Sequence, residues 1–321
     1  MSIGRFTQGL HDLGSGLYAW LQPDGGWGWS NAGLVVDGDQ SLLVDTLFDE
    51  PLTARLLAAM QDATGIEPGA IPLLVNTHAN GDHTHGNALV PNAEVIASAA
   101  AAREMAELPP AMVAQLMAGA NAGALGPAGE MLKEVFAPFD LGSARGRLAT
   151  RTFEETLEVR VGDKAVELRR LGPAHTAGDV VVHVPGDRTV FTGDILFADV
   201  TPIMWAGPVG NWLAACDWIL ALDVEHIVPG HGPPADKSHV RRLQEYLRYV
   251  DREARRRYQA GMGAFEAAQD IALGEFRHWL DAERLVANVM ALYREYAGDS
   301  SPPDVISVFH AMARMRRQLR G

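Results

Sequence analysis

The stretch Thr77–Asn87 concentrates side chains that bind metal ions. Within eight residues it places three histidines and one aspartate, which are His78, Asp82, His83 and His85. Imidazole nitrogens and carboxylate oxygens are the ligands that zinc, iron and manganese accept in proteins. A single histidine in a polar loop is typical of a solvated surface, but this density favours a metal site.

Three later segments each place one more side chain of this kind just after a predicted strand. His175 lies in the turn GPAHTAGD, Asp194 ends the run FTGD, and His231 lies in VPGHG. Loops at the ends of strands gather at one edge of an α/β sheet and commonly carry its functional residues. We therefore expect the four segments to form one site.

The order of these motifs, HANGDH and then GPAHTAGD, TGD and PGHG, resembles the metallo-β-lactamase-fold hydrolase superfamily over about residues 30–231. The resemblance implies an αββα sandwich with a two-metal site on one edge, holding divalent ions, with zinc expected and manganese or iron as alternatives. It also implies that Asp45 orients a ligand histidine, since such an acceptor fixes the imidazole tautomer. The implied ligands are His78 and His175 for the first metal, Asp82, His83 and His231 for the second, and Asp194 as the bridge between them.

One position departs from the family pattern. Where the family usually has H-x-H-x-D-H, this chain carries Asn80 in place of the second histidine. An amide offers zinc only a carbonyl oxygen, which is a weaker donor than imidazole. We therefore expect the first metal site to be weaker or more open. His85, expected at the start of a helix, either compensates by binding metal or points at the substrate.

The elements that must position these residues are short strands and helices. Apolar patterning predicts helices at 50–64 and 212–222, and strands at 17–21, 31–36, 41–45, 72–76, 155–161, 165–171, 180–184, 189–192 and 226–228. The pattern turns helical from about 97 to 139, and four helices are expected at 238–262, 264–280, 282–296 and 302–319. The fold class is therefore α/β, with a domain over 1–236 that contains a helical insert at 97–139, followed by a helical extension over 237–321.

The composition narrows the classes of partner. A chain of 321 residues with 47% hydrophobic content can bury the core of one or two domains. Its 27 Lys and Arg against 40 Asp and Glu give a net charge of −13, which argues against nucleic acid. The single Cys216 excludes an internal disulfide, and no run reaches the roughly 18 apolar residues of a membrane span. With no secretion leader recognisable, we expect a cytoplasmic protein without a membrane partner.

The expected reaction is hydrolysis of an ester, thioester or related acyl bond by a metal-bound hydroxide. Asp82, Asn80 and His85 are expected to act on the reacting groups. Trp27 and Trp29 lie in the Gly-rich loop 22–30 and are expected, with the insert, to wall the substrate pocket. Their apolar and aromatic character favours a small-molecule substrate with a hydrophobic or aromatic acyl group over a small charged one.

Two alternative functions stay open. The HANGDH variant also resembles cyclase or thioesterase-like proteins of aromatic polyketide pathways. A non-catalytic metal-binding or scaffold protein is the rival from another class, but it gives no reason for six ligand-type residues to keep their types and order. The extension carries an apolar stripe that either the same chain or a second copy must cover, so a homo-oligomer is a further expectation; the stripe is Leu243, Tyr246, Leu247 and Val250.

Overall fold

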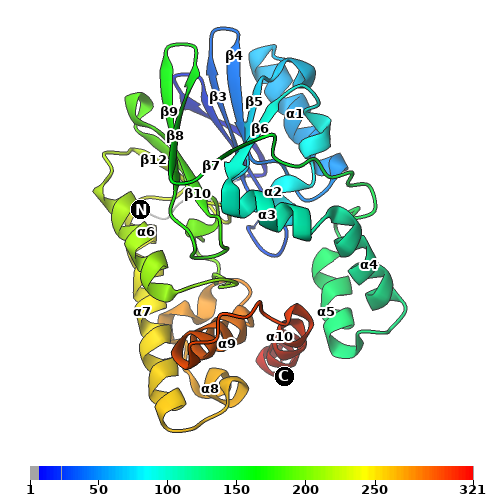
Figure 1. The fold of residues 1–321 in the computed structure, drawn as a ribbon, viewed down its shortest axis with the longest axis vertical. Coiled ribbons are helices and arrows are strands. Elements are labelled where there is room, and N and C mark those ends of the chain that lie inside the picture. Colours follow the sequence, from blue (N-terminus) through cyan, green and yellow to red (C-terminus); the bar gives the residue numbers. More distant parts are fainter. Residues whose placement is uncertain (1–6, 23, 321) are drawn as a thin grey trace.

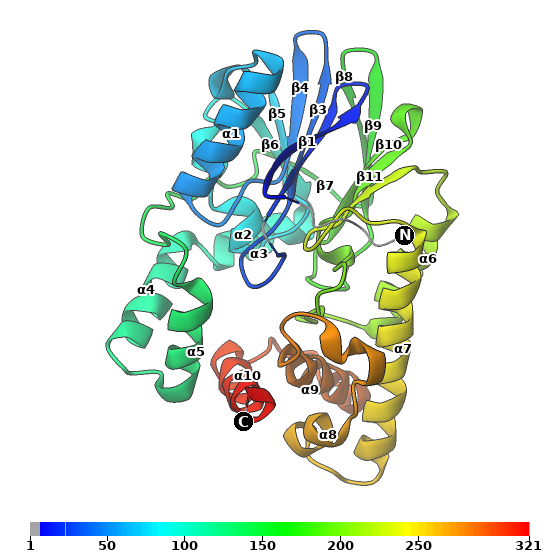
Figure 2. The same ribbon diagram turned by 180° about the vertical axis from the view of Figure 1, so that it is seen from behind.

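The computed structural model describes residues 7–22 and 24–320 and confirms the α/β class, with two sheets packed face to face (Figure 1, Figure 2). Within these residues the first sheet has seven strands in the order β1 to β7, and the second has five in the order β12, β11, β10, β9, β8. The strands are β1 Gly9–Gly14, β2 Leu17–Leu21, β3 Ala32–Asp37, β4 Gln40–Val44, β5 Leu73–Val75, β6 Glu94–Ser98, β7 Arg151–Phe153, β8 Thr156–Val161, β9 Lys164–Arg170, β10 Val180–Val184, β11 Thr189–Phe191 and β12 His226–Val228.

Alternating side chains along the central strands fill both faces of each sheet. In β4, Leu42 and Val44 join the apolar cluster between the sheets, whereas Leu43 joins the cluster beneath the helices. In β10, Val181 likewise faces the helices while its neighbours in the strand face the other sheet. Strands that are apolar on both faces must be covered on both, which makes the four-layer sandwich the expected arrangement.

Strand direction brings the loops with chemistry to one edge of each sheet. β4 and β5 are parallel, as are β11 and β12. β9 runs in the same direction as β11 because both are antiparallel to β10. The loops after β4, β5, β9, β11 and β12 carry, in that order, Asp45, His78, His175, Asp194 and His231.

Local capping explains where the first helix begins and ends. α1, Glu50–Thr64, starts after Asp49, whose carboxylate accepts the N–H of Leu52 at 2.7 Å, and it stops at Gly65 with a φ of 75°. A side-chain acceptor before the first turn and a left-handed glycine after the last are the usual helix boundaries. The other helices of the sandwich are the single turn α2, Gly81–Thr84, and α6, Val209–Ala221.

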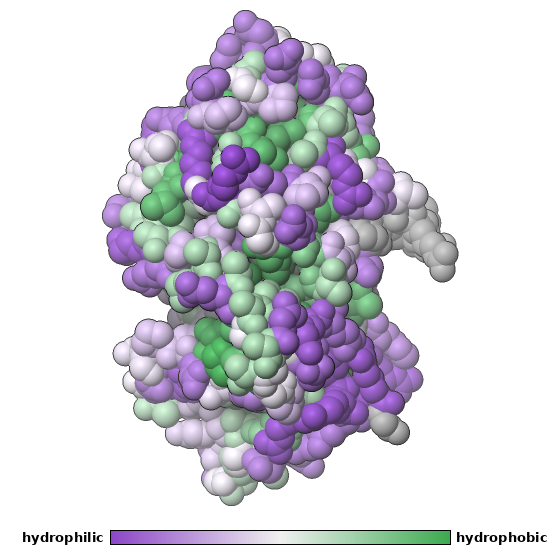
Figure 3. All heavy atoms as spheres, turned by 90° about the vertical axis from the view of Figure 1, so that its right-hand side faces the viewer, coloured by the Kyte–Doolittle hydropathy of each residue, from purple (hydrophilic) through white to green (hydrophobic). Residues whose placement is uncertain are grey.

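The insert between β6 and β7 forms three helices, α3 Ala99–Glu107, α4 Pro110–Asn121 and α5 Gly126–Phe136. It begins later than the expected residue 97, because the last residues of β6 still pair with β7. α4 and α5 lie beyond the same end of the sandwich as the C-terminal helices (Figure 1). On that side of the molecule hydrophobic residues are interspersed with hydrophilic ones (Figure 3).

The extension consists of α7 Lys237–Gln259, α8 Ala264–Asp270, α9 Arg284–Ala297 and α10 Val305–Arg320. The single helix expected over 264–280 is wrong. α8 ends at Asp270, and Gly274, with a φ of 57°, opens a separate 3-10 turn over Gly274–His278. Ile271 is extended, with a φ of −77° and a ψ of 114°, so the helix ends ahead of Gly274, and the positive φ of that glycine keeps the chain from returning to an α-helix.

The extension is packed into the rest of the chain. Its apolar stripe is buried by the chain itself, with Leu243 and Tyr246 fully covered. Both belong to one continuous apolar cluster that also contains Trp212 of α6 and Leu43 of β4. This stripe therefore does not call for a second copy. None of the helices within residues 7–320 combines the length and apolarity that crossing a bilayer requires.

Candidate metal centre

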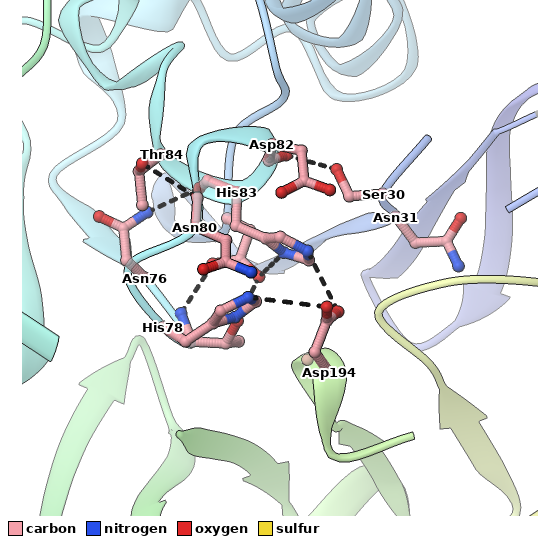
Figure 4. A network of polar contacts seen from close by, with 12 residues as sticks. Ser30, Asn31, Asn76, His78, Asn80, Asp82, His83, Thr84 and Asp194 are labelled. Carbon is pink, nitrogen blue, oxygen red and sulfur yellow. Dashed lines mark hydrogen bonds and ion pairs between the residues drawn. The ribbon is translucent and has the colours of Figure 1, made fainter. Parts of the chain in front are cut away.

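The six ligands expected from the sequence meet at one edge of the sandwich. They form two groups, in each of which the candidate ligand atoms lie within 4.8 Å of one another. Figure 4 shows His78 and His83 pointing toward Asp194 from the opposite sheet. The first group is His78, His175 and Asp194, and the second is Asp82, His83 and His231.

Asp194 occupies the middle of the cluster. Its Oδ2 lies 3.2 Å from His175 Nε2, 3.7 Å from His78 Nε2 and 3.5 Å from His231 Nε2. Its Oδ1 lies 3.2 Å from His83 Nε2. One carboxylate thus faces all four imidazoles, which is the placement of a group that bridges two cations.

The far nitrogens of three imidazoles are held by hydrogen-bond acceptors. His83 Nδ1 donates to Asp45 Oδ2 at 2.9 Å, His175 Nδ1 to the Ile203 carbonyl at 2.6 Å, and His231 Nδ1 to the Gly25 carbonyl at 3.0 Å. Because Nδ1 must carry the hydrogen in such bonds, Nε2 of the neutral ring presents a lone pair to the centre.

The atoms that face the centre have the character of metal ligands. His78 Nε2, His83 Nε2 and Asp194 Oδ1 are buried and have no hydrogen-bond partner among residues 7–22 and 24–320. A buried polar atom without a partner is costly, and several such acceptors aimed at one point are explained by a cation. Nitrogen and oxygen donors in this number fit a divalent metal such as zinc.

Asp45 organises the side of the centre that belongs to the first sheet. Its carboxylate accepts from Thr77 N and Thr77 Oγ1, each at 2.7 Å, as well as from His83. Thr77 Oγ1 in turn lies 3.0 Å from His78 Nδ1. Asp45 has a φ of 61°, a left-handed conformation that is unfavourable for most residues and is held here by these bonds.

The charges at the centre compensate one another. Burial would lower the pKa of His83, but the carboxylates of Asp194, Asp45 and Asp82 raise this pKa well above the ordinary histidine value. Burial would raise the pKa of Asp194, but the surrounding imidazoles lower it well below the ordinary value. The buried carboxylates therefore need positive charge, which a proton or a metal cation supplies.

Asn80 stands where the family pattern has a histidine, and its Nδ2 lies 2.9 Å from His175 Nε2. Its side chain therefore reaches the first ligand group. Unlike His175, which is fully buried, Asn80 is partly exposed, as is the neighbouring Asp82. These two residues lie on the partly exposed side of the ligand cluster.

His85 lies outside both ligand groups. It follows α2 instead of starting a helix, so the expected position is wrong, because α2 is a single turn that has already ended. Its ring lies against Gly81, where a Cβ atom would come within 2.5 Å of it, and 5.5 Å from the ring of Phe48. His85 is as buried as the ligand histidines, and because it lies outside both groups it is not the replacement for the missing imidazole.

The two tryptophans of loop 24–30 pack directly against the insert and also contact α10, which the sequence did not indicate; that they form walls of a substrate pocket stays a prediction. Trp29 packs on Phe139 with a centroid distance of 4.7 Å, and Trp27 packs edge-on against Phe136 at 6.4 Å. Trp27 also lies 5.7 Å from Phe309 of α10. The extension thus contributes to the aromatic surroundings of the centre.

Sequence reasoning missed the carbonyl groups that orient two ligands, those of Gly25 and Ile203. Every residue has a carbonyl, so no residue type could have indicated them. It also missed Phe48, whose ring lies 5.1 Å from both Phe136 and Phe139 and so connects His85 to the insert. The position of Phe48, four residues after the end of β4, was the available signal.

Comparison with known proteins gives one curated relative and several solved structures. The chain is 26% identical over 207 residues to the 2,4-dinitroanisole O-demethylase subunit alpha of Nocardioides sp. (strain JS1661), a match that covers 62% of this chain and 51% of that protein. The chain therefore spans about half the length of the curated relative that it matches.

Among solved structures, the inverting sec-alkylsulfatase Pisa1 from Pseudomonas sp. matches with a TM-score of 0.65 and 16% identity, over 91% of this chain and 50% of that one. The metallo-beta-lactamase from Pontibacter korlensis matches with a TM-score of 0.56 and 18% identity, over 75% of this chain and 99% of that one. At 91% coverage the unmatched part is shorter than the extension, so the fold shared with the alkylsulfatase includes some of the C-terminal helices.

The sequence model of the metallo-beta-lactamase superfamily matches residues 25–231, which is more than half of the chain. This span contains all six candidate ligands together with Asp45 and Asn80. The resemblance seen in the motifs and the expected class of metallo-β-lactamase-fold hydrolase are therefore confirmed at the level of the family: the chain belongs to the metallo-beta-lactamase superfamily.

Proposed function

We propose that this protein is a metal-dependent hydrolase that cleaves an ester, thioester or related acyl bond of a neutral aromatic substrate. Its proposed cofactors are two divalent ions, of which zinc is the favoured metal. One observation carries the proposal: the two ligand groups lie on either side of the Asp194 carboxylate, and their imidazole lone pairs point toward it. Divalent cations held there would supply a hydroxide nucleophile at neutral pH and polarise the bond to be cleaved.

Different residues of the chain are proposed to orient the imidazoles and to contact the substrate. Asp45 and the carbonyls of Ile203 and Gly25 hold the imidazoles in place. Asp82 and Asn80 lie on the partly exposed side, where the Asn80 amide can donate a hydrogen bond to the oxygen that gains charge as the bond breaks. His85 borders this side through Gly81 and contributes a ring nitrogen that has no partner among the described residues.

The aromatic walls support an aromatic substrate without a charge. Trp27, Trp29, Phe136 and Phe139 offer large apolar faces, and Trp29 is only half-buried. Arg284 lies 4.2 Å over the Trp27 ring, but its guanidinium is paired with Asp281 at 3.0 Å. A cation already paired in this way is a poor receptor for a sulfate group, so a neutral ester or thioester fits better than an alkyl or aryl sulfate.

Cleavage of an aromatic ether is a second candidate. The curated relative is named for O-demethylation of 2,4-dinitroanisole, a neutral nitroaromatic ether, and the aromatic walls described above suit such a ring. A cyclase or thioesterase acting on an aromatic polyketide is the variant of the main proposal that the HANGDH motif supports.

The test is metal analysis of the purified protein followed by a panel of an aryl ester, an aryl thioester, acetyl thioester, an aryl sulfate and 2,4-dinitroanisole. We expect bound divalent metal and turnover of the aryl ester or thioester, lost on chelation and restored by zinc. Turnover of the ether alone favours the second candidate. Bound metal with no turnover of any member supports the non-catalytic rival, and absence of metal contradicts the proposal.

The same panel tests whether the loop reads the substrate. Trp29→Ala should lower kcat/KM for the aryl thioester by an amount equivalent to about 1–3 kcal/mol of lost transition-state binding. It should have little effect on kcat/KM for the acetyl thioester. Trp218→Ala is the matched control, because Trp218 is a half-buried tryptophan of α6 that packs on Arg169 and His183. Equal losses on both thioesters would show that Trp29 does not recognise the aryl group.

The location of the protein and the class of its binding partner remain proposals. The buried, unpaired Cys216 is consistent with a cytoplasmic location, where thiols stay reduced. The net charge of −13 supports a small-molecule substrate over nucleic acid.

A further inference from the structure

The segment 201–207 wraps around His175 without belonging to either sheet. The Ile203 carbonyl accepts from His175 Nδ1 at 2.6 Å. The backbone N–H groups of Trp205 and Ala206 both donate to the His175 carbonyl, at 2.9 and 3.1 Å. The position of this irregular segment therefore sets the tilt of the His175 ring and the direction of its Nε2.

Asn288 of α9 holds this segment on both sides of Ile203. Its Nδ2 donates to the Pro202 carbonyl at 2.9 Å, and its Oδ1 accepts from Met204 N at 2.8 Å. Nδ2 also donates to Tyr246 Oη of α7 at 3.0 Å. Asn288 is 2% exposed, so these bonds form away from water, where a lost partner is costly.

The same helix holds the segment at a second point. Arg284, one turn before Asn288, donates through Nη1 to the Thr201 carbonyl at 3.0 Å. Just ahead of α9, Leu280 pairs with Val200 through an isolated β-bridge. Since no sheet strand contains residues 201–207, α9 is the regular element that fixes them.

We propose that Asn288 is a positioning residue of the metal centre, and that α9 thereby makes the C-terminal extension part of that centre. Asn288 fixes the backbone on either side of Ile203, the Ile203 carbonyl fixes the imidazole of His175, and His175 presents Nε2 to the first ligand group. The inference rests on the metal centre of the proposed function and is independent of the substrate.

The test is a metal titration of Asn288→Leu, whose side chain has a similar volume and no hydrogen-bonding atoms. Partners that orient a metal ligand typically change metal affinity 10–100-fold when removed. We expect affinity at the His78, His175 and Asp194 group to fall about tenfold, with the second group unchanged. Competition with a chromophoric chelator gives the two affinities, and the absorption of the cobalt-loaded protein reports the altered ligand geometry.

Two controls separate positioning from general loosening of the fold. Tyr246→Phe removes the hydrogen bond between Tyr246 and Asn288 and leaves the hydrogen bonds of Asn288 to Pro202 and Met204 in place. Gln244→Leu removes a buried amide of α7 whose bonds, within the described part of the chain, go to Leu213 and Asp217 of α6. Both are expected to retain wild-type affinity at both groups, even where their melting temperature falls as far as that of Asn288→Leu.

Each outcome decides. Wild-type affinities in Asn288→Leu, or an equal loss in Gln244→Leu, overturn the inference, whereas a wild-type protein that binds no metal overturns the proposed function instead. If Asn288→Leu does not fold, Asn288→Asp takes its place, because it keeps an acceptor for Met204 N and loses the donor to the Pro202 carbonyl. The same weakening at one group is then expected, and unchanged affinities overturn the inference.

Discussion

Asn80 is the residue at which this centre departs from its family. Its amide reaches the first ligand group, with Nδ2 2.9 Å from His175 Nε2, but an amide oxygen is a weaker donor to zinc than imidazole. We expect Asn80→His to tighten metal binding at this group by at least about tenfold, or ~1.4 kcal/mol. Metal titration against a competing chelator measures the change, and an affinity equal to that of the wild type would contradict the assignment of this position.

His83 makes metal binding depend on pH. Burial lowers the pKa of His83, but the carboxylates of Asp194, Asp45 and Asp82 outweigh this effect and raise the pKa well above the ordinary histidine value. A metal ion at Nε2 therefore competes with a proton. Below that raised pKa, each unit of falling pH should weaken the apparent affinity by up to about tenfold, the effect of one competing proton. We expect this weakening to begin at a higher pH than an unperturbed histidine ligand would cause. Calorimetric titrations with zinc between pH 6 and 8 measure this weakening. An affinity that stays the same across this range would contradict the expectation.

The ligands could be predicted at the level of residues because chemistry restricts them to a few side-chain types. His78, Asp194 and His231 are recognisable from type and order alone. The groups that orient them are not, since the Ile203 and Gly25 carbonyls belong to the backbone. Their role depends on the path of the chain and becomes visible only in the fold.

At the scale of elements, the centre depends on loops that approach more closely than side chains normally allow. A Cβ atom on Gly230 would lie 2.0 Å from Asp194 Oδ1 and 2.6 Å from the Gly193 carbonyl carbon. We expect Gly230→Ala to cost about 1–3 kcal/mol of unfolding free energy through overpacking and to reduce metal content. Urea denaturation and metal analysis test this.

The control for this substitution is Gly186→Ala. A Cβ atom there meets nothing within 4 Å, and Gly186 is not among the glycines with positive φ. It should therefore retain both stability and metal. If Gly230→Ala behaved like this control, the close approach of the two loops would not be what requires glycine in the PGHG motif.

Helices in which apolar residues recur at a regular spacing could be predicted, whereas the points at which such helices are interrupted could not. The helix over 50–64 matches α1, because Asp49, Pro51 and Gly65 mark its ends in the sequence. The expected helix over 264–280 instead ends at Asp270, because Ile271 is extended although the sequence pattern still looks helical. The insert was visible as a change of pattern, but the contact of loop 24–30 with α10 joins residues nearly 300 positions apart, for which no local pattern exists.

The candidate metal centre spans both sheets of the molecule. His78, Asp82 and His83 come from the connection that follows β5 of the first sheet, while His175, Asp194 and His231 come from connections of the second. An ion bound by ligands from both sheets exists only when the sandwich is closed. The first ligand group draws on both sheets, and so does the second, so each ion would tie the two halves together.

Metal removal should therefore destabilise the entire fold rather than one loop. An ion that binds only the folded state adds about 4 kcal/mol when its free concentration is a thousand times its dissociation constant. We expect chelation to lower the Tm by several degrees in one cooperative transition, since about 1 kcal/mol corresponds to a few degrees in a protein of this size. Differential scanning calorimetry with and without chelator measures this, and adding zinc back should restore the original Tm. If metal analysis showed the ions gone while the Tm stayed the same, the two sheets would not be held together through this centre.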